Sequence, residues 1–364
     1  MLVTLSAALS RAGCRVRVAL FRDPRGLSRA VEEQARSAGL RVAPIDCHGR
    51  WDWSAVRALR TIFAEEPPDI LHAHGYKADL YAYAAAWRRR LPLVATCHNW
   101  PDPHPRMQAY AKLDRFILRS FDHITTPSQD VAQVLLSSGI ASARITWVRN
   151  GIDIEAFRHA KPSLLRDPSE TLVGFVGRLV PEKGGETFLR AAQRVLAVRR
   201  NVRFIMVGDG PAGADWKTLA AQLGIERHVD FTGTRDDMPG VYASLDMFVL
   251  PSHNEAMPMS VLEAMSAGKP VIATRVGAVP TLVLDGETGH LCAPGDADQI
   301  ARSVLALLQN SEEAHRLGEN GYRRVHTEFS SEAMAETYLR LYRNVLTADA
   351  NGVTQPAACP ESNG

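Results

Sequence analysis

Short runs of β-branched and apolar residues alternate with helical patterns from one end of the chain to the other. Strands connected in this way run parallel, because each crossover helix returns the chain to the edge of the sheet from which it left. Strands are expected at residues 15–21, 41–45, 69–73, 93–97, 123–126, 145–148, 172–176, 203–207, 229–231, 247–250 and 271–273. The pattern therefore predicts an α/β protein with parallel sheets and helical crossovers.

The length of the chain allows two such domains. Its 364 residues can bury two cores of ordinary size, and a polar, proline-containing stretch separates the two halves. We expect an N-terminal domain over residues 1–158, a linker over 159–170 and a C-terminal domain over 171–330. A helix over residues 331–346 and a disordered tail over 347–364, rich in small and polar residues, complete the expected organisation.

The start of the chain departs from the usual order of a doubly wound sheet. Such a sheet normally begins with a strand and a glycine-rich turn that lead into the first helix. Here the helical pattern of residues 4–11 comes first, and the expected first strand does not precede it. Two explanations are open: the sheet lacks its central strand, or the sequence is truncated at its start.

Composition and cysteine spacing exclude several classes of protein. Hydrophobic residues make up 46% and charged residues 23% of the chain, a balance that indicates a folded rather than a disordered protein. No run approaches the roughly 18 apolar residues that span a bilayer, and no basic signal-peptide region precedes the first apolar stretch. The five cysteines are scattered and never spaced as CxxC, which argues against a disulfide framework and a zinc site. We therefore expect a cytoplasmic protein.

The two halves differ in charge. Residues 1–150 contain 21 Lys and Arg against 13 Asp and Glu, whereas the remainder contains 21 against 27. Two explanations of this difference are open. It is ordinary surface variation, or the N-terminal half meets an anionic membrane or a phosphorylated acceptor. The basic, aromatic-flanked stretches 81–90 and 105–120 could rest on the inner face of the cell membrane or be solvated helix faces. No nucleic acid is expected, because the basic residues follow no known reading motif.

Two glutamates mark the segment after the expected strand at 247–250. Glu255 lies in the loop that follows this strand, and Pro258 suits the first turn of a helix that then contains Glu263. Carboxylates in these places can accept several hydrogen bonds from sugar and ribose hydroxyls. A solvated loop glutamate and a glutamate on a helix face are the alternative.

A glycine-rich segment follows the expected strand at 172–176. It contains Gly177, Arg178 and Lys183, and its spacing is not that of a Walker A loop. Glycines let the backbone approach a ligand, and the two cations supply the charge that a diphosphate leaving group requires. A plain turn with surface cations is the alternative.

A second glycine motif follows the expected strand at 203–207. Gly208, Gly210 and Gly213 fit the GxGxxG pattern, and Asp230 lies twenty residues beyond Gly210. Alone, this spacing suggests the dinucleotide-binding turn of a dehydrogenase. However, the motif follows the second strand of its half, and Pro211 constrains the loop. We interpret it as part of a mononucleotide pocket.

Three histidines, His72, His74 and His98, lie at expected strand ends in the first half, where open α/β sheets bind ligands. A metal site would need further ligands that the sequence does not indicate, so we expect none. His98, in a polar loop, is the leading substrate contact. Asp296 and Asp298 match the DxD pattern of metal-dependent sugar transferases, but they open a late helix, where an aspartate is expected as a cap.

Taken together, these motifs resemble glycosyltransferase family 4, which has the GT-B fold. The resemblance runs from about residue 4 to 346, and its most specific segments are 177–184, 207–211, 255–280 and 285–296. It implies two Rossmann-like domains that face each other across a cleft, with the C-terminal helix crossing back to the N-terminal domain. Family members begin with a strand and a glycine-rich loop, and this chain lacks both.

The resemblance also implies an activity: retaining transfer of a sugar from a UDP- or GDP-sugar to a hydroxyl acceptor, in polysaccharide or glycolipid synthesis. No obligatory metal or other cofactor is implied. The implied catalytic residues are His98, Arg178, Lys183 and Glu255. The implied donor-binding residues are Gly177, Arg178, Lys183, Gly208, Glu255, Ala256, Met257, Pro258, Met259 and Glu263, with Glu263 on the ribose. The implied acceptor-side residues are His74, His98, Asn99 and Asn150.

Three other functions stay open on the sequence alone. A sugar-nucleotide epimerase of related fold would convert the donor without an acceptor. A dehydrogenase would bind a nicotinamide cofactor. A non-catalytic sugar-nucleotide-binding protein would bind the donor and turn nothing over.

Overall fold

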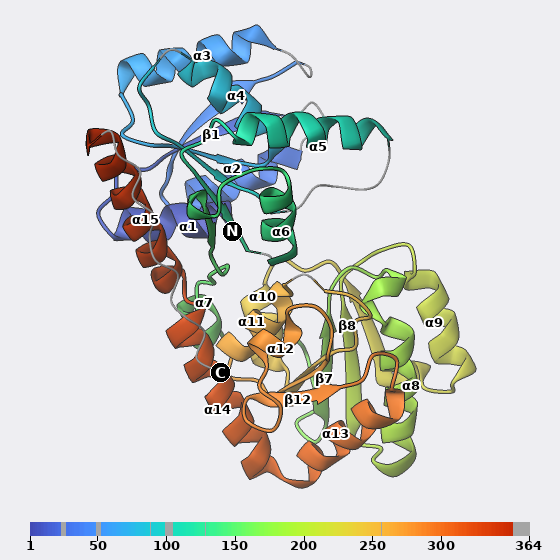
Figure 1. Ribbon diagram of the computed structural model, residues 1–364. Helices are drawn as coiled ribbons and strands as arrows, with labels where there is room; N and C mark the ends of the chain where they lie inside the picture. Colours follow the sequence, from blue (N-terminus) through green and yellow to red (C-terminus); the bar gives the residue numbers. More distant parts are fainter. Residues whose placement is uncertain are drawn as a thin grey trace. The chain divides into compact units, whose positions relative to one another are not determined.

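The computed structural model describes residues 1–22, 27–48, 52–87, 89–98, 105–127, 129–255 and 257–351. The chain forms two compact units (Figure 1). The first unit contains residues 1–151 together with the C-terminal segment from residue 331, and the second contains residues 152–330. Both units are built on parallel sheets, so the expected α/β class is confirmed.

The second unit is a doubly wound sheet of six strands in the order β12-β11-β10-β7-β8-β9. The strands are β7 (Thr171–Val176), β8 (Val202–Val207), β9 (Val229–Gly233), β10 (Met247–Leu250), β11 (Val271–Thr274) and β12 (Gly289–Cys292). All of their pairings are parallel. The order reverses between β7 and β10, and open sheets of this kind bind ligands outside the carboxyl ends of the two strands at such a reversal.

Helices cover both faces of this sheet, which is why its strands are apolar on both sides. In β7, Val173 and Phe175 pack into one core and Leu172 into the other. The helices are α7 (Glu155–Arg158), α8 (Gly185–Val198), α9 (Gly213–Gln222), α10 (Met238–Ser244), α11 (Met259–Ser266), α12 (Val279–Leu282), α13 (Ala297–Gln309) and α14 (Ser311–Glu328). The sequence did not predict β12, because its residues Gly-His-Leu-Cys contain no β-branched side chain.

The first unit contains two separate parallel sheets, one with the order β1-β2 and one with the order β3-β4-β5-β6. The strands are β1 (Arg17–Arg22), β2 (Arg41–Asp46), β3 (Leu71–His74), β4 (Leu93–Thr96), β5 (His123–Thr126) and β6 (Ile145–Trp147). The helices are α1 (Leu2–Arg11), α2 (Leu27–Ser37), α3 (Trp53–Glu65), α4 (Tyr76–Ala86), α5 (Pro105–Leu118), α6 (Gln129–Ser137) and α15 (Ser331–Asn351). Among the described residues, no strand lies between β1 and β3 to join the two sheets.

The C-terminal helix α15 belongs to the first unit, although the whole second unit separates it in sequence from the other elements of that unit. The Tyr338 hydroxyl lies 3.1 Å from the hydroxyls of both Thr96 and Thr125, at the ends of β4 and β5. The Tyr342 hydroxyl lies 2.6 Å from Nδ1 of His72 in β3. Buried hydrogen bonds of this kind fix the helix on the sheet, because leaving these groups without partners would be costly. Residues 352–364, most of the expected disordered tail, lie outside the described residues.

The expected linker at residues 159–170 differs from the structure, in which this segment is part of the second unit. The backbone N–H groups of Ser163 and Leu164 both donate to the Ser244 hydroxyl at 2.9 Å. Arg166 forms a salt bridge of 3.0 Å with Asp246. The polar residues that suggested a free linker therefore form hydrogen bonds to α10 and to the start of β10.

Candidate functional site

The loops after β7 and β10 pack directly against each other. His253 N–H donates to the carbonyl of Glu182 at 2.8 Å. Gly184 has a left-handed backbone with φ +68°, and a Cβ atom there would overlap the carbonyl of Pro251. Glycine is therefore required at residue 184 both for its backbone conformation and for the close approach of the two loops.

The GxGxxG segment packs onto the loop after β7. Gly208 has φ +129°, and a Cβ atom there would overlap the carbonyl of Gly177. Leu179 N–H donates to the carbonyl of Asp209 at 2.9 Å, and Ala212 N–H donates to the carbonyl of Leu179 at 2.9 Å. The first glycine of this motif thus serves contact between two loops, in addition to any ligand contact.

Lys183 and Glu255 meet where these loops join. Lys183 Nζ lies 2.6 Å from Glu255 Oε1, and the Ser252 hydroxyl donates to the same oxygen at 2.7 Å. Glu255 is only 8% exposed, while the Lys183 side chain retains 24% of its surface. A nearly buried carboxylate is stable here because it has a cation and a hydroxyl donor as partners. The lysine side chain thus remains partly open to solvent.

The loop that carries Glu255 has further support on its inner side. The Thr274 hydroxyl at the end of β11 donates to the carbonyl of Ser252 at 2.5 Å. Gly277 has φ +49°, and a Cβ atom there would overlap the carbonyl of Glu255. Ala256, an expected donor contact, lies outside the described residues. Pro258 occupies the N-cap position of α11, directly before the first turn in which it was expected, and the helix begins at Met259.

Glu263 lies on α11, between buried apolar positions of the helix. Burial raises the pKa of its carboxyl, and the nearby Tyr242 hydroxyl opposes that rise in pKa. Tyr242 is fully buried, and among the described residues its hydroxyl has no hydrogen bond of ordinary geometry.

Arg178 is exposed, and the described part of the chain offers it no salt bridge. The loops after β7 and β10, together with α11, therefore present two cations and two carboxylates at the reversal of strand order. The cations are Arg178 and Lys183, and the carboxylates are Glu255 and Glu263.

The histidines of the first unit have unequal environments. His72 is held by Tyr342 and, at 2.8 Å, by the Thr96 hydroxyl, and burial lowers its pKa to about 3. The His74 ring lies 4.3 Å from that of His72 and 6.0 Å from that of His98. Burial also lowers the pKa of His74 and of His98. His72 therefore has a structural role, because both of its ring nitrogens have hydrogen-bond partners. His98 is the exposed one of the three histidines.

Two further expectations concern metal ligands and the acceptor side. Within the described ranges, no group of three His, Cys, Asp or Glu residues could hold a metal ion. Asp296 accepts a hydrogen bond of 2.8 Å from the Gln299 N–H, so its predicted role as a helix cap is confirmed. The buried Oδ1 atom of Asn150 has no hydrogen-bond partner in the described part of the chain. Asn99 lies outside the described residues.

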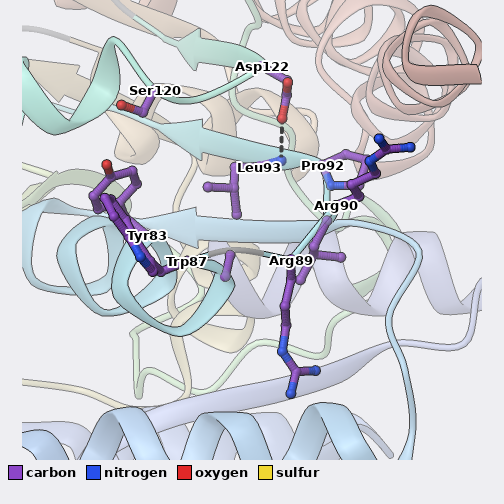
Figure 2. Close-up of a pocket in the computed structure, with 10 residues that line it drawn as sticks. Tyr83, Trp87, Arg89, Arg90, Pro92, Leu93, Ser120 and Asp122 are labelled. Carbon is purple, nitrogen blue, oxygen red and sulfur yellow. Dashed lines mark hydrogen bonds between the residues drawn. The ribbon is translucent and has the colours of Figure 1, made fainter. Parts of the chain in front are cut away.

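A small cavity of about 290 Å³ lies at the amino ends of β4 and β5, under the basic stretch 81–90. Figure 2 shows Tyr83, Trp87, Arg89 and Arg90 around it, with Asp122 accepting a hydrogen bond of 2.7 Å from the Leu93 N–H. Trp87 is 52% exposed. Open α/β sheets bind ligands at the opposite ends of their strands, so this cavity lies at the other edge of the sheet from His74 and His98. None of the described helices is long and apolar enough to cross a membrane.

A pair of buried carboxyl groups, which the sequence did not single out, joins α4 to α5. Asp79 and Asp114 are both nearly inaccessible to solvent. Burial, together with the neighbouring Asp114, raises the pKa of Asp79 well above its ordinary value of 3.8. The unfolded chain loses this proton at a lower pH than the folded chain does. This group therefore lowers the free energy of unfolding as pH rises from its unfolded pKa toward its folded pKa.

Replacing Asp79 with asparagine is expected to remove this pH dependence, because the amide stays neutral and keeps nearly the same shape. The Tm of Asp79→Asn should exceed that of the wild-type chain at pH 7 by several degrees, while the two should agree near pH 4. Melting curves followed by circular dichroism between pH 4 and pH 8 measure the difference. An equal offset at every pH would contradict a shifted titration and indicate a packing effect instead.

Two family models match the chain. The model described as "Glycosyltransferase Family 4" matches residues 1–156, and the model described as "Glycosyl transferases group 1" matches residues 157–324. Together they account for nearly all of the chain before α15. Their boundary falls close to that between the two compact units at residues 151 and 152.

Curated relatives match at moderate identity. A D-inositol 3-phosphate glycosyltransferase from Mycobacterium marinum is 32% identical over 284 residues, which are 71% of this chain and 59% of the relative. The chain thus spans less than two thirds of the length of that relative. An N-acetyl-alpha-D-glucosaminyl L-malate synthase from Bacillus anthracis is 27% identical over 83% of this chain and 81% of its own.

Solved structures share the fold. Anabaena Alr3699/HepE, solved in complex with UDP and glucose, superposes with a TM-score of 0.74 at 22% identity, covering 94% of this chain and 95% of its own. Sucrose-phosphate synthase from Thermosynechococcus elongatus superposes with a TM-score of 0.72 at 23% identity, covering 94% of this chain and 92% of its own. Both likenesses establish the architecture, and the predicted GT-B fold is confirmed.

Proposed function

The chain belongs to glycosyltransferase family 4, and from this membership we propose that it transfers a sugar from a nucleoside diphosphate sugar to a hydroxyl acceptor. The observation that carries the proposal is the pairing of Lys183 with Glu255 at the reversal of strand order in the second unit. A HepE structure of the same fold was solved with UDP-glucose, which favours a nucleotide-sugar donor.

In this proposal the diphosphate lies against the loop after β7. Arg178 and Lys183 neutralise the charge that builds up on the leaving nucleoside diphosphate, which is the work that a bound metal ion does in other transferases. No cofactor is proposed, since two cations already serve the leaving group. Glu263 accepts hydrogen bonds from the ribose hydroxyls. Glu255 and the backbone N–H groups of Met257 and Met259 hold the sugar at the start of α11.

The transfer step is proposed to retain the configuration of the sugar. The bond between the anomeric carbon and the phosphate oxygen breaks, and the acceptor oxygen bonds to the same face of that carbon. The acceptor proton passes to the departing phosphate oxygen, so no enzymic nucleophile is required. Glu255 already accepts hydrogen bonds from Lys183 and Ser252, which suits it to stabilise the sugar and not to attack it.

Acceptor recognition is assigned to the first unit. The rings of His74 and His98 lie at the carboxyl ends of β3 and β4, where open parallel sheets bind ligands. The lowered pKa of each imidazole favours its neutral form near pH 7, and a neutral imidazole can either donate or accept a hydrogen bond. Asn99 and Asn150 complete the proposed acceptor set, and a lipid-linked acceptor at an anionic membrane surface suits the excess of basic residues in 1–150.

The experiment is a panel of UDP-, GDP- and ADP-sugars with carbohydrate and lipid-linked acceptors, followed by nucleoside diphosphate release and by NMR of the anomeric proton. Release that requires an acceptor, with a product of the same anomeric configuration as the donor, supports the proposal. Conversion of the donor without an acceptor would indicate an epimerase. Binding without turnover would indicate a sugar-nucleotide-binding protein, and either result would overturn the proposed transfer.

Replacing Glu263 with glutamine is expected to weaken donor binding about tenfold and to change kcat less than threefold. The amide loses the charge-assisted hydrogen bonds to ribose, and a loss of about 1.4 kcal/mol corresponds to that factor. Isothermal titration with the donor and initial-rate kinetics measure the two effects separately. Glu312→Gln, on the exposed start of α14, is the matched control. An unchanged donor affinity in Glu263→Gln would remove the ribose role.

A further inference from the structure

The cavity at the amino ends of β4 and β5 contains polar groups that the proposed transfer does not use (Figure 2). Its wall is formed by the end of α4, the turn into β4 and the turn between α5 and β5. At about 30 Å³ for each molecule of liquid water, its volume of 290 Å³ corresponds to roughly ten waters. This is enough space for one sugar ring with a charged substituent and too little for a dinucleotide.

Two guanidinium groups at this cavity have no acidic partner. Arg89 and Arg90 are both exposed, and the described residues form no salt bridge with either of them. Other exposed arginines of the same unit are paired, as Arg36 is with Glu32 at 2.9 Å. The Arg89 N–H donates to the Ala86 carbonyl at 2.8 Å, so the backbone of the turn is held while the guanidinium groups keep their donors for a ligand. Guanidinium groups bind phosphate and carboxylate groups in a bidentate manner.

One carboxylate at the cavity is already used to fix the sheet. Asp122 accepts a hydrogen bond of 2.7 Å from the Leu93 N–H, and the Asp122 N–H donates to the Leu93 carbonyl at 2.9 Å. Only one oxygen of this carboxylate is engaged, so the other can accept a hydrogen bond from a ligand hydroxyl. The two arginines still give the cavity two positive charges against one negative charge. A ligand that carries a negative charge is therefore favoured over a neutral one.

Two aromatic rings form another part of the wall. The rings of Tyr83 and Trp87 meet edge to face, with their centroids 5.6 Å apart. Trp87 is about half exposed, although burying so large a ring is favourable. Figure 2 shows the two rings on one side of Leu93 and the two arginines on the other. An aromatic face packs well against the C–H groups of a sugar ring, and the Tyr83 hydroxyl can bond to the ring hydroxyls.

We propose that this cavity is a second ligand site, which binds an anionic saccharide: one sugar ring that carries a phosphate or a carboxylate. The ring packs on Trp87, and its anionic group binds Arg89 and Arg90. Tyr83 and the second oxygen of Asp122 form hydrogen bonds with the ring hydroxyls. The site lies at the opposite edge of the sheet from the histidines assigned to the acceptor. It therefore holds a carbohydrate on the first unit without taking part in transfer.

Hydrogen exchange by mass spectrometry on the full chain is the first test. The probes are glucose 6-phosphate and glucuronate, and the controls are glucose, inorganic phosphate and phenyl phosphate at the same concentration. We expect at least threefold slower exchange in residues 89–93 and 120–122 with one or both of the charged sugars, and no such effect with the controls. No sugar nucleotide is present, so the outcome does not depend on the proposed activity.

Three results of this test would overturn the proposal. Unchanged exchange with both charged sugars would show that the cavity binds no anionic saccharide. Equal protection by inorganic phosphate would indicate a simple anion site, and equal protection by phenyl phosphate would indicate a site for aromatic anions. Protection by glucose 6-phosphate alone or by glucuronate alone identifies the anionic group.

Two pairs of variants test whether the ligand binds in this cavity. Trp87→Ala and Arg90→Ala should each raise the Kd of the protecting sugar at least tenfold by isothermal titration, since tryptophan and arginine are the side chains whose loss costs most in binding. Trp53→Ala, at a residue that is 74% exposed, and Arg57→Ala, at an exposed position of the same helix α3, are the controls. Their Kd values should stay within twofold of the wild-type value. Unchanged Kd values in Trp87→Ala and Arg90→Ala would place the ligand elsewhere and overturn the proposal.

A vesicle experiment separates the saccharide from an anionic membrane surface, the other partner that basic and aromatic side chains suit. Vesicles of equal parts phosphatidylcholine and phosphatidylglycerol are mixed with the full chain, and exchange is followed in the same segments. Slower exchange in residues 89–93 with vesicles, and none with the charged sugars, would overturn the proposal in favour of a membrane contact. Slower exchange with a charged sugar, and none with vesicles, is the expected result.

Discussion

Replacing Lys183 with methionine is expected to lower the rate of sugar transfer by about 100- to 1000-fold, the usual cost of removing one preorganised group that stabilises transition-state charge. Methionine keeps most of the length of the side chain and removes its charge and its hydrogen-bond donors. Because Glu255 is nearly buried and Lys183 is its cation, the variant also leaves a carboxylate with the Ser252 hydroxyl as its remaining described donor. Rates at saturating donor and donor affinity by titration check both effects.

The loss in Lys183→Met has two sources that a double-mutant cycle separates. Glu255→Gln removes the carboxylate charge that Lys183→Met leaves without its cation. The double variant should therefore recover the stability that Lys183→Met loses, but it should not recover the transfer rate. Lys161→Met, at an exposed lysine of the same unit, is the control for loss of a positive charge. A rate for Lys183→Met within threefold of the wild-type rate would contradict the diphosphate role.

Replacing Gly184 with alanine is expected to destabilise the second unit by about 2–3 kcal/mol more than the same change at Gly224. The two glycines have nearly the same φ, +68° and +69°, in the left-handed region. They differ in space: a Cβ atom at residue 184 would overlap the Pro251 carbonyl, whereas one at residue 224 has no neighbour within 4 Å. Left-handed alanine costs about 1–2 kcal/mol at either position, and the overlap adds the cost of overpacking at Gly184 alone.

Urea unfolding of the two alanine variants measures this difference. Because the backbone cost cancels between them, the remainder reports the contact between the loops after β7 and β10. Gly184→Ala should also weaken donor binding, since the overlap forces apart the loops that carry Lys183 and Glu255. Equal stability of the two variants would show that the loops can separate freely, and would contradict a preformed site.

The sequence was sufficient to predict every strand of this fold except β12, because alternating strand and helix patterns are local. It also placed Lys183 and Glu255 in loops after strands. It did not predict that they touch, since 72 residues separate them and their contact depends on β7 and β10 being neighbours. Strand order is a property of the whole sheet, and no local pattern encodes it.

Other features escaped the sequence for similar reasons. Polar residues at 159–170 indicated a linker, although this segment is part of the second unit, where Ser163 and Arg166 bond to Ser244 and Asp246. His72 looked like a candidate ligand at a strand end, but α15 brings Tyr342 to its ring from 270 residues away. Tyr242, Thr274 and the Asp79–Asp114 pair were also missed, because single polar residues inside apolar patterns give no signal until their neighbours are known.

The central claim is that the loops after β7 and β10 bind a sugar nucleotide, and hydrogen exchange with and without the donor panel tests it most directly. We expect slower exchange in residues 177–184 and 257–266 with one class of sugar nucleotide, no change with NAD, and no protection in Lys183→Met at the same donor concentration. Transfer activity accompanied by unchanged exchange in both segments, or by protection confined to the first unit, would contradict it.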